Sequence, residues 1–160
     1  MKLPQGFRSA SIAAGLKSSG ALDLTLIHNQ GPLFMGAAVF TSNKVVAAPV
    51  IWSRQVAKGG TVRAVVLNSG GANACTGPQG FADTHKTAEH VGQLLKISSG
   101  EVIICSTGLI GELLPMEKIL SAKRRAKISM PRLMRCVILS LINSENTKRR
   151  LRPITKAMGE

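Results

Sequence analysis

Two continuous apolar runs with an amphipathic segment between them restrict the folds open to this chain more than any other feature. The runs occupy residues 63–68 (RAVVLN) and 101–106 (EVIICS), and such runs are typical of strands buried on both faces. The segment at residues 81–96 has apolar side chains at helical spacing, namely Ala88, Val91, Leu94 and Leu95. The order of strand, helix and strand predicts a crossover unit in which the two runs are central strands.

Weaker patterns add further elements to this unit. Residues 23–29 alternate apolar and polar side chains between turn residues, which predicts a strand. Residues 36–41 (GAAVFT) predict a second strand, and the short connection predicts that the two pair antiparallel. Residues 116–120 predict a short helix, and Asp83 or Thr84 is expected to cap the longer one. Together these elements predict an α/β fold with a mixed sheet and covering helices.

The last quarter of the sequence differs in composition from the rest. Residues 1–120 carry 10 Lys and Arg against 6 Asp and Glu and hold 15 of the 16 glycines, whereas residues 121–160 carry 11 against 2. We therefore divide the chain into a domain at residues 1–120 and a basic tail at residues 121–160. A shift of reading frame near residue 121 explains the change. The alternative is a genuine basic appendage that binds nucleic acid or an anionic surface through an amphipathic helix bearing Leu133, Val137 and Leu141.

The sequence argues against several common kinds of site and location. No apolar stretch approaches the roughly 18 to 20 residues of a membrane span and no signal peptide is evident, so a cytoplasmic protein is expected. Cys75, Cys105 and Cys136 lack the spacing of disulfides or zinc sites, so reduced thiols are expected, with Cys105 in the core. His28 is expected to be solvated or hydrogen-bonded rather than catalytic. Residues 15–20 have the glycine spacing of a phosphate-binding loop but lack its lysine, so no nucleotide site is expected there.

The polar segments that follow the two apolar runs hold the unusual chemistry. They are residues 68–77 (NSGGANACTG) and 106–111 (STGLIG). Small residues at the carboxyl end of a strand let backbone amides approach a ligand, and Asn, Ser and Thr offer donors and acceptors. The alternative is that residues 68–71 form only a turn, because these residue types tolerate turn conformations. Both interpretations place a loop after each strand.

Six ordered blocks of sequence give a more specific signal. They read GFRSA (6–10), AGLKxSGxxDL (14–24), VFTxN (39–43), APV (48–50), VLNSGxANACTG (66–77) and CSTGLIG (105–111). In this order they resemble the amino-terminal part of the glutamate N-acetyltransferase family, the ornithine acetyltransferases of arginine biosynthesis. The resemblance covers residues 6 to about 120. It implies part of an αββα layered architecture.

The resemblance also implies a mechanism of acyl transfer. Members of the family move acetyl from N-acetylornithine to glutamate, and some also use acetyl-CoA. The acetyl group passes through a threonine that self-cleavage places at the start of a β chain. Residues 106–108 match the segment that supplies the oxyanion hole, with the Thr107 side chain and the Gly108 backbone amide as donors. The alternative is that Thr107 caps a helix after the strand.

The chain departs from the family pattern after the Leu-Pro-Met segment at residues 114–116. Residues 121–160 contain neither the Thr-Thr-Asp acceptor-binding segment nor the glycine-rich loop and nucleophilic threonine. No nucleophile, cofactor site or metal site is therefore expected in this chain, which we interpret as an incomplete member that is inactive alone. The implied substrates are N-acetylornithine and glutamate, and the implied partner is a β chain in an α2β2-type assembly.

Overall fold

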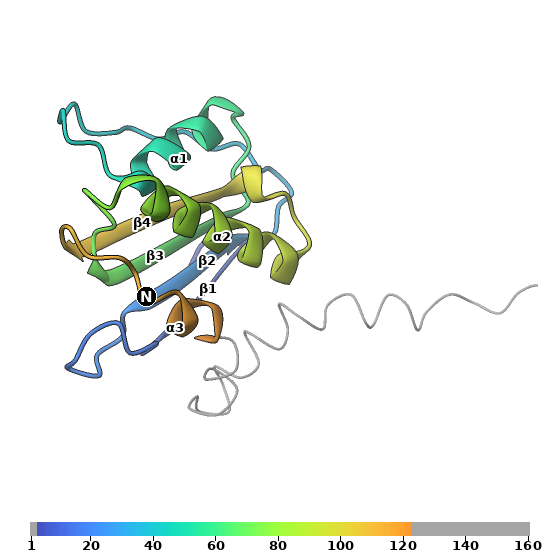
Figure 1. Ribbon diagram of the computed structural model, residues 1–160. Coiled ribbons are helices and arrows are strands. Elements are labelled where there is room, and N and C mark those ends of the chain that lie inside the picture. Colours follow the sequence, from blue (N-terminus) through green and yellow to red (C-terminus); the bar gives the residue numbers. More distant parts are fainter. Residues whose placement is uncertain (1–2, 123–160) are drawn as a thin grey trace, which may run out of the picture.

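The computed structural model describes residues 3–122, which form a four-stranded sheet and the helices that cover it (Figure 1). In chain order the elements are β1 (Phe7–Ile12), β2 (Leu24–Asn29), α1 (Ala48–Lys58), β3 (Ala64–Gly71), α2 (Gly77–Leu95), the short 3-10 helix η1 (Ser99–Glu101), β4 (Val102–Leu109) and α3 (Met116–Leu120). The strands lie in the order β1-β2-β3-β4. The pairs β1–β2 and β2–β3 are antiparallel, and β3–β4 is parallel. The mixed sheet and the crossover through α2 confirm the predicted fold class.

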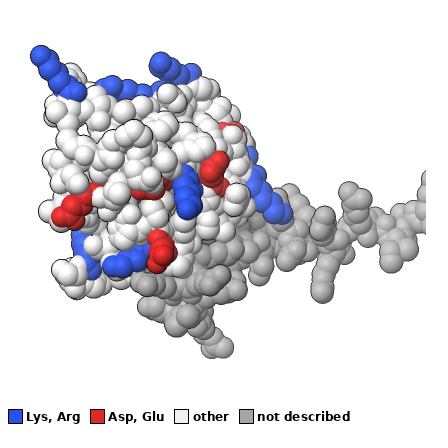
Figure 2. All heavy atoms as spheres, viewed as in Figure 1, with Lys and Arg blue, Asp and Glu red and all other residues white. Residues whose placement is uncertain are grey.

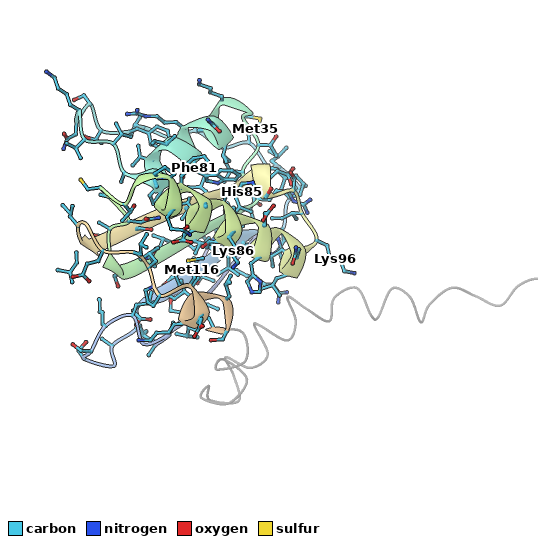
Figure 3. The ribbon with its side chains drawn as sticks, in the orientation of Figure 1. Met35, Phe81, His85, Lys86, Lys96 and Met116 are labelled. Carbon is cyan, nitrogen blue, oxygen red and sulfur yellow. The ribbon has the colours of Figure 1, made fainter. Side chains whose placement is uncertain are left out.

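The hydrophobic core lies between one face of the sheet and the helices (Figure 1). Because side chains alternate between the two faces of a strand, only every second residue of β3 and β4 contributes to it. The indole ring of Trp52 meets the rings of Phe81 and His85, both labelled on α2 in Figure 3, with centroid separations of 6.4 Å and 4.9 Å. The buried residues of this core are Trp52, Val56, Ala64, Val66, Ala88, Val91, Val102 and Ile104.

Helix α1 also protects the outer edge of β4. The Ser53 hydroxyl donates to the Ile104 carbonyl (2.8 Å) and accepts from the Ile104 N–H (3.1 Å). The indole N–H of Trp52 donates to the Val102 carbonyl (2.9 Å). An unpaired strand edge exposes backbone groups that invite another strand. These three bonds occupy backbone groups of β4 from the side opposite β3, so α1 takes the place of a further strand.

The opposite face of the sheet is open in the part of the chain that the structure describes. Leu67 is 37% exposed, and Cys105, its neighbour across the β3–β4 pair, is also exposed. The prediction that both apolar runs are buried on two faces is therefore wrong, as is the prediction that Cys105 is a core residue. Among residues 3–122 the helices pack on one face only, and the alternation of strand residues leaves half of these side chains on the other.

The predicted strand at residues 36–41 is absent from the described part of the chain. The position beside β2 that this strand was expected to fill is taken by β1, which pairs with β2 along its whole length. Only an isolated bridge between Met35 and Thr61 forms near the predicted strand. Val39 is almost fully exposed. The segment is small and apolar, but most of its residues are exposed, and Phe40 meets the Arg54 guanidinium of α1 instead of a neighbouring strand.

The three α-helices agree with the sequence predictions to different degrees. Helix α1 was not predicted; it starts with Pro49 in its first turn, where the missing N–H costs no hydrogen bond. Helix α2 starts at Gly77, four residues before the expected position. Asp83 and Thr84 therefore lie inside α2 rather than at its cap, and both are buried. The predicted short helix at residues 116–120 is confirmed as α3.

His28 is buried in β2 and not solvated. It is 8% exposed, and neither ring nitrogen has a hydrogen-bond partner in the described structure. Burial, together with the charges of Arg63 and Arg8, lowers the pKa of His28 from its ordinary value, so the neutral ring is favoured. The prediction was wrong because the alternation of residues in a strand does not reveal which face the helices cover.

The described surface carries charges of both signs. Figure 2 shows Lys and Arg together with Asp and Glu on the side of the domain that faces the viewer. Within residues 3–122, no helix has the length and apolar character to cross a membrane. The predicted basic tail, its helix bearing Leu133, Val137 and Leu141, and Cys136 lie outside the described residues.

Candidate active site at the carboxyl ends of β3 and β4

The parallel pairing of β3 and β4 brings the two predicted polar segments together. The carboxyl ends of parallel strands meet at one edge of a sheet, which is where open α/β sheets bind ligands. Both strands run further than the sequence predicted, so residues expected in loops continue the sheet as far as Gly71 and Leu109. The opposing residues at this edge are Asn68 and Ser106, Ser69 and Thr107, and Gly70 and Gly108.

Thr107 is exposed and lies on the open face of the sheet, in the same row as Cys105. It belongs to β4, and the next helix of the chain begins only at Met116. The interpretation of Thr107 as a helix cap is therefore wrong. No hydrogen bond joins the Thr107 hydroxyl to another of the residues that the structure describes. The hydroxyl is accessible to a ligand from the open side.

Gly108 is required by a close approach of backbone to backbone. A Cβ atom on Gly108 would lie 2.5 Å from the Gly70 carbonyl carbon and 2.7 Å from the Gly71 nitrogen. Gly108 also has a φ of +132°, and Gly70 a φ of +130°, a region that residues with side chains rarely adopt. A Cβ on Gly70 would in turn lie 2.9 Å from the Leu16 carbonyl oxygen. Three backbone segments are thus stacked without intervening side chains.

The register of the β3–β4 pair is irregular at this point. Gly71 pairs with both Thr107 and Leu109, so one residue of β3 faces two positions of β4. Such bulges redirect side chains and are common beside active sites. The Ala72 N–H donates to the Leu109 carbonyl (2.8 Å), which resumes the connection beyond the bulge. The irregularity therefore lies beside Thr107 and Gly108.

A polar contact on the helix-covered side joins the two strand ends. The Ser106 hydroxyl donates to Asn68 Oδ1 (2.6 Å), and Asn68 Nδ2 donates to the Gly71 carbonyl (3.1 Å). Asn68 is 5% exposed. We call these two hydrogen bonds the Asn68 clasp. The clasp links the residue before Thr107 to the residue against which Gly108 packs.

Asp23 holds a loop against the same edge. Its carboxylate accepts hydrogen bonds from the backbone N–H groups of Ala14 (2.6 Å), Leu16 (2.6 Å) and Lys17 (3.0 Å). Its own carbonyl accepts from the Ser69 N–H (2.8 Å). Sequence reasoning missed this role, although Asp23 stands in one of the six blocks. An acidic residue next to a strand and shortly after a glycine-containing loop is the available signal for such an anchor.

The rest of the first polar segment anchors helix α2. Asn73 is buried with a φ of +49°, and its Nδ2 donates to the Gly80 carbonyl (2.8 Å) and to Thr84 Oγ1 (2.9 Å). The Thr76 hydroxyl donates to Asn73 Oδ1 (2.7 Å). The interpretation of residues 68–71 as only a turn is wrong, because they belong to β3 and lie beside Thr107 and Gly108. Residues 73–76 fix the start of α2.

Cys105 shares the open face with Thr107 but is poorly suited to act as a nucleophile. Although the residue is exposed at the sheet surface, partial burial raises the pKa of its thiol above the ordinary value. The reactive form of cysteine is the thiolate, so a raised pKa lowers its reactivity at neutral pH. No cluster of metal-ligating side chains occurs among residues 3–122.

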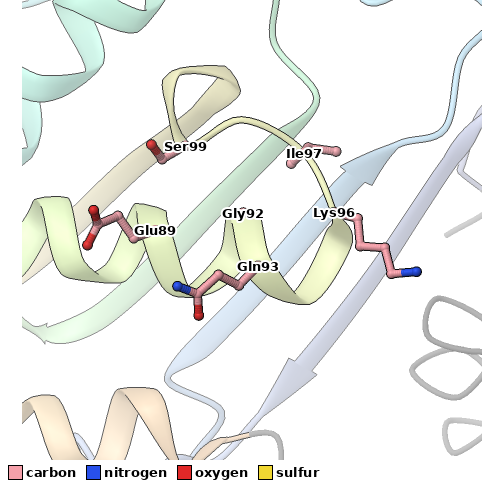
Figure 4. Close-up of a pocket in the computed structure, with 6 residues that line it drawn as sticks. All are labelled: Glu89, Gly92, Gln93, Lys96, Ile97 and Ser99. Atoms are coloured by element: carbon pink, nitrogen blue, oxygen red, sulfur yellow. The ribbon is translucent and has the colours of Figure 1, made fainter.

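A surface hollow at the other end of the sheet takes no part in this site. It lies where α2 ends and the 3-10 helix begins, before the start of β4 (Figure 4). Because β4 runs from Val102 to Leu109, this hollow adjoins its amino end and Thr107 stands near its carboxyl end. The residues that line it are Glu89, Gly92, Gln93, Lys96, Ile97 and Ser99.

Comparison with known proteins agrees with the arrangement of these residues. The sequence profile of the ArgJ family matches residues 8–145. The chain belongs to the ArgJ family. The matched range extends beyond residue 120, where the basic tail is predicted to begin. The position of this domain boundary therefore stays a prediction.

Curated ArgJ relatives are highly similar over the matched part. The arginine biosynthesis bifunctional protein ArgJ of Streptomyces avermitilis is 62% identical over 122 residues, which are 76% of this chain and 32% of that protein. The corresponding protein of Mycobacterium tuberculosis strain H37Rv is 59% identical over 123 residues, or 74% of this chain and 30% of that protein. The chain thus spans about a third of the length of these curated ArgJ relatives.

Two solved ArgJ structures share the fold. The crystal structure of ornithine acetyltransferase complexed with ornithine from Mycobacterium tuberculosis superimposes with a TM-score of 0.73 at 59% identity, covering 74% of this chain and 64% of that chain. ArgJ from Bacillus halodurans superimposes with a TM-score of 0.70 at 38% identity, covering 74% and 61%. The layered α/β fold and the membership of an acyltransferase family of arginine biosynthesis are confirmed.

Proposed function

We propose that residues 1–120 supply the oxyanion-stabilising part of an acetyltransferase that moves acetyl from N-acetylornithine to glutamate. Membership of the ArgJ family supports the reaction class. The M. tuberculosis structure that contains ornithine supports the substrate class. The family resemblance implies acetyl-CoA as a second acetyl donor, and we include it in the proposal. Stabilising the oxyanion requires no bound cofactor.

One observation carries the assignment of the site: the exposed Thr107 precedes a glycine whose backbone packs directly on another backbone. The tetrahedral intermediate of acyl transfer places negative charge on one oxygen, and fixed donors lower its energy. Thr107 offers a hydroxyl on the open face, and Gly108 offers a backbone amide with no Cβ beside it. We assign these two groups as the oxyanion hole.

We propose that this chain lacks the nucleophile of the reaction. Residues 121–160 contain no threonine in the expected Ala-Thr context after a glycine-rich loop. We therefore expect the purified 160-residue chain to show no transfer from N-acetylornithine to glutamate. Turnover that persists through further purification would reveal a nucleophile elsewhere in the chain. In an assembled enzyme, the β chain is the partner that supplies the nucleophile.

A chimera tests the oxyanion hole. Residues 1–120 replace the matching segment of the S. avermitilis relative, which is 62% identical. In this enzyme Thr107→Ala should lower kcat by about 10² to 10³ with little change in KM, because the lost donor acts mainly on the transition state. The matched control is Thr41→Ala, in the exposed loop before α1. An unchanged kcat in the Thr107→Ala chimera would remove Thr107 from the site.

The reading-frame account of the basic tail has its own test. Translation of the nucleotide sequence past codon 120 in the two other frames should recover a Thr-Thr-Asp segment followed by a glycine-rich loop. Unrelated residues or stop codons in every frame would leave the basic appendage as the explanation. This outcome would favour binding of nucleic acid or an anionic surface by residues 121–160.

A further inference from the structure

We propose that Asn68 is a positioning residue of the oxyanion hole, which fixes Thr107 and Gly108 from the opposite side of the sheet. This inference rests on the proposed function of Thr107 and Gly108. Asn68 itself is buried on the helix-covered side, so it is placed to act through its neighbours and not on substrate. Its two hydrogen bonds are those of the Asn68 clasp.

The first bond of the clasp fixes the strand that carries Thr107. The Ser106 hydroxyl donates to Asn68 Oδ1 at 2.6 Å, and the two residues are opposite each other in the β3–β4 pair. Successive side chains of a strand point to opposite faces. Holding Ser106 toward the helices therefore holds Thr107 toward the open face. The residue pair Ser69–Thr107 follows immediately, before the register becomes irregular.

The second bond fixes the surface on which Gly108 rests. Asn68 Nδ2 donates to the Gly71 carbonyl at 3.1 Å, so it holds the last residues of β3 beside the register shift. The Gly71 nitrogen lies only 2.7 Å from the place that a Cβ of Gly108 would occupy. A displacement of the Gly70–Gly71 peptide therefore displaces Gly108. Interior groups in contact leave little room for independent movement.

Asn29 provides a matched comparison within the same sheet. Its Nδ2 donates to the Leu33 carbonyl (2.8 Å) and its Oδ1 accepts from the Gly31 N–H (2.9 Å), so it also makes one donated and one accepted bond, both within the loop that follows β2. It is 7% exposed, against 5% for Asn68. Because β2 is antiparallel to β3, Asn29 stands at the end of the sheet away from Thr107. The two asparagines are alike in burial and in making one donated and one accepted bond, but only Asn68 bonds to a neighbouring strand.

The decisive variant is Asn68→Asp in the chimera, with Asn29→Asp as its control. An aspartate keeps the shape and the acceptor for Ser106 but loses the donor to the Gly71 carbonyl. We expect kcat to fall by about ten- to a hundredfold for Asn68→Asp, because small displacements of a reacting geometry have effects of this size. KM should stay within about twofold, as for a group that acts only in the transition state. Asn29→Asp should lower the unfolding midpoint comparably and leave kcat within about twofold.

The pH profile separates positioning from general destabilisation. A protonated aspartic acid regains a donor for the Gly71 carbonyl, and burial raises the pKa of a carboxyl group. The ratio of kcat for Asn68→Asp to kcat for the parent chimera should therefore increase as the pH falls. The milder variant Ser106→Ala, which removes only the first bond, should lower kcat by less. In the 160-residue chain itself, the Gly108 amide resonance should shift in Asn68→Asp and Ser106→Ala but not in Asn29→Asp.

The outcomes distinguish this inference from the proposed function. Loss of kcat in Thr107→Ala with none in Asn68→Asp overturns the positioning role alone. No loss in Thr107→Ala overturns the proposed oxyanion hole and with it this inference. Equal loss of kcat in Asn68→Asp and Asn29→Asp, a change confined to KM, or a kcat ratio that is independent of pH would each show that Asn68 only stabilises the fold.

Discussion

The two faces of the sheet differ in what they contribute. The helix-covered face holds the apolar core, the bonds from α1 to the edge of β4, and the Asn68 clasp. The open face holds the exposed residues of the same strands, including Leu67 and Thr107. The covered face therefore supplies the stability of residues 3–122, and the open face presents the chemistry. Because residues alternate along a strand, one stretch of sequence serves both purposes.

The strongest test of this comparison is a large-to-small substitution on each face. Trp52→Ala removes a ring from the core and the donor to the Val102 carbonyl, so it should cost about 3–5 kcal/mol of unfolding free energy. Leu67→Ala on the open face should cost only about 1–2 kcal/mol, because 37% of the residue is already exposed. Urea unfolding of both variants of the 160-residue chain measures the two values. Equal losses would show that the open face is packed as tightly as the covered one.

A glycine pair tests the close approach at the site. Gly108→Ala must move the Gly70–Gly71 backbone and also adopt an unfavourable φ of +132°. Gly111→Ala meets nothing within 4 Å and has a φ of +85°, so it should show only the backbone cost of about 1–2 kcal/mol. The loss of stability at Gly108 should exceed that at Gly111. If thermal unfolding finds the two variants alike, the strands do not touch as described.

The comparison of faces also explains how far sequence reasoning reaches. The strands at β2, β3 and β4 and the helices α2 and α3 were predicted because periodicity and apolar runs report local structure. Strand β1 (FRSASI) was not predicted, because its serines lie on the open face and mask the alternation of apolar and polar residues. Residues 36–41 were assigned in its place because they are apolar, although pairing is decided by neighbours that are distant in sequence.

The candidate site could be predicted only in part. Thr107 and Gly108 were identified through the six blocks and not from spacing, since a threonine before a glycine is common. The packing of Gly108 on Gly70 joins residues 38 positions apart and requires the parallel register of β3 and β4. The roles of Asp23 and Asn68 depend in the same way on tertiary contacts. Local sequence contains the residue types but not their juxtaposition.

The buried His28 sharpens the comparison through pH. Its pKa is lowered by burial and by the charges of Arg63 and Arg8, so the unfolded chain binds a proton more readily than the folded one. The contribution of the neutral His28 ring to the free energy of unfolding is therefore complete above the ordinary histidine pKa of about 6.5, and it declines as the pH falls below that value. Urea unfolding at pH 7.5 and pH 5 should show a larger decrease for the parent chain than for His28→Leu. An equal decrease in both chains would contradict a buried, unpaired imidazole.

The smallest expected effect concerns an exposed hydrogen bond between α3 and the loop before β2. Lys118 Nζ donates to the Gly15 carbonyl (2.7 Å), which ties α3 to the loop that Asp23 also holds. Because this bond is exposed to solvent, Lys118→Met should cost no more than about 1 kcal/mol. The control is Lys58→Met, at the end of α1 and away from the loop. A loss above about 2 kcal/mol would show that this bond contributes more than an exposed hydrogen bond can.

The most direct measurement is a crystal structure of the chimera trapped with an analogue of the tetrahedral intermediate. The account predicts that the oxyanion lies on the open face, about 2.7–3.1 Å from both the Thr107 hydroxyl and the Gly108 amide nitrogen. The Asn68 clasp should be intact beneath it. An oxyanion bound by other donors, with Thr107 and Gly108 beyond hydrogen-bonding distance, would contradict the account.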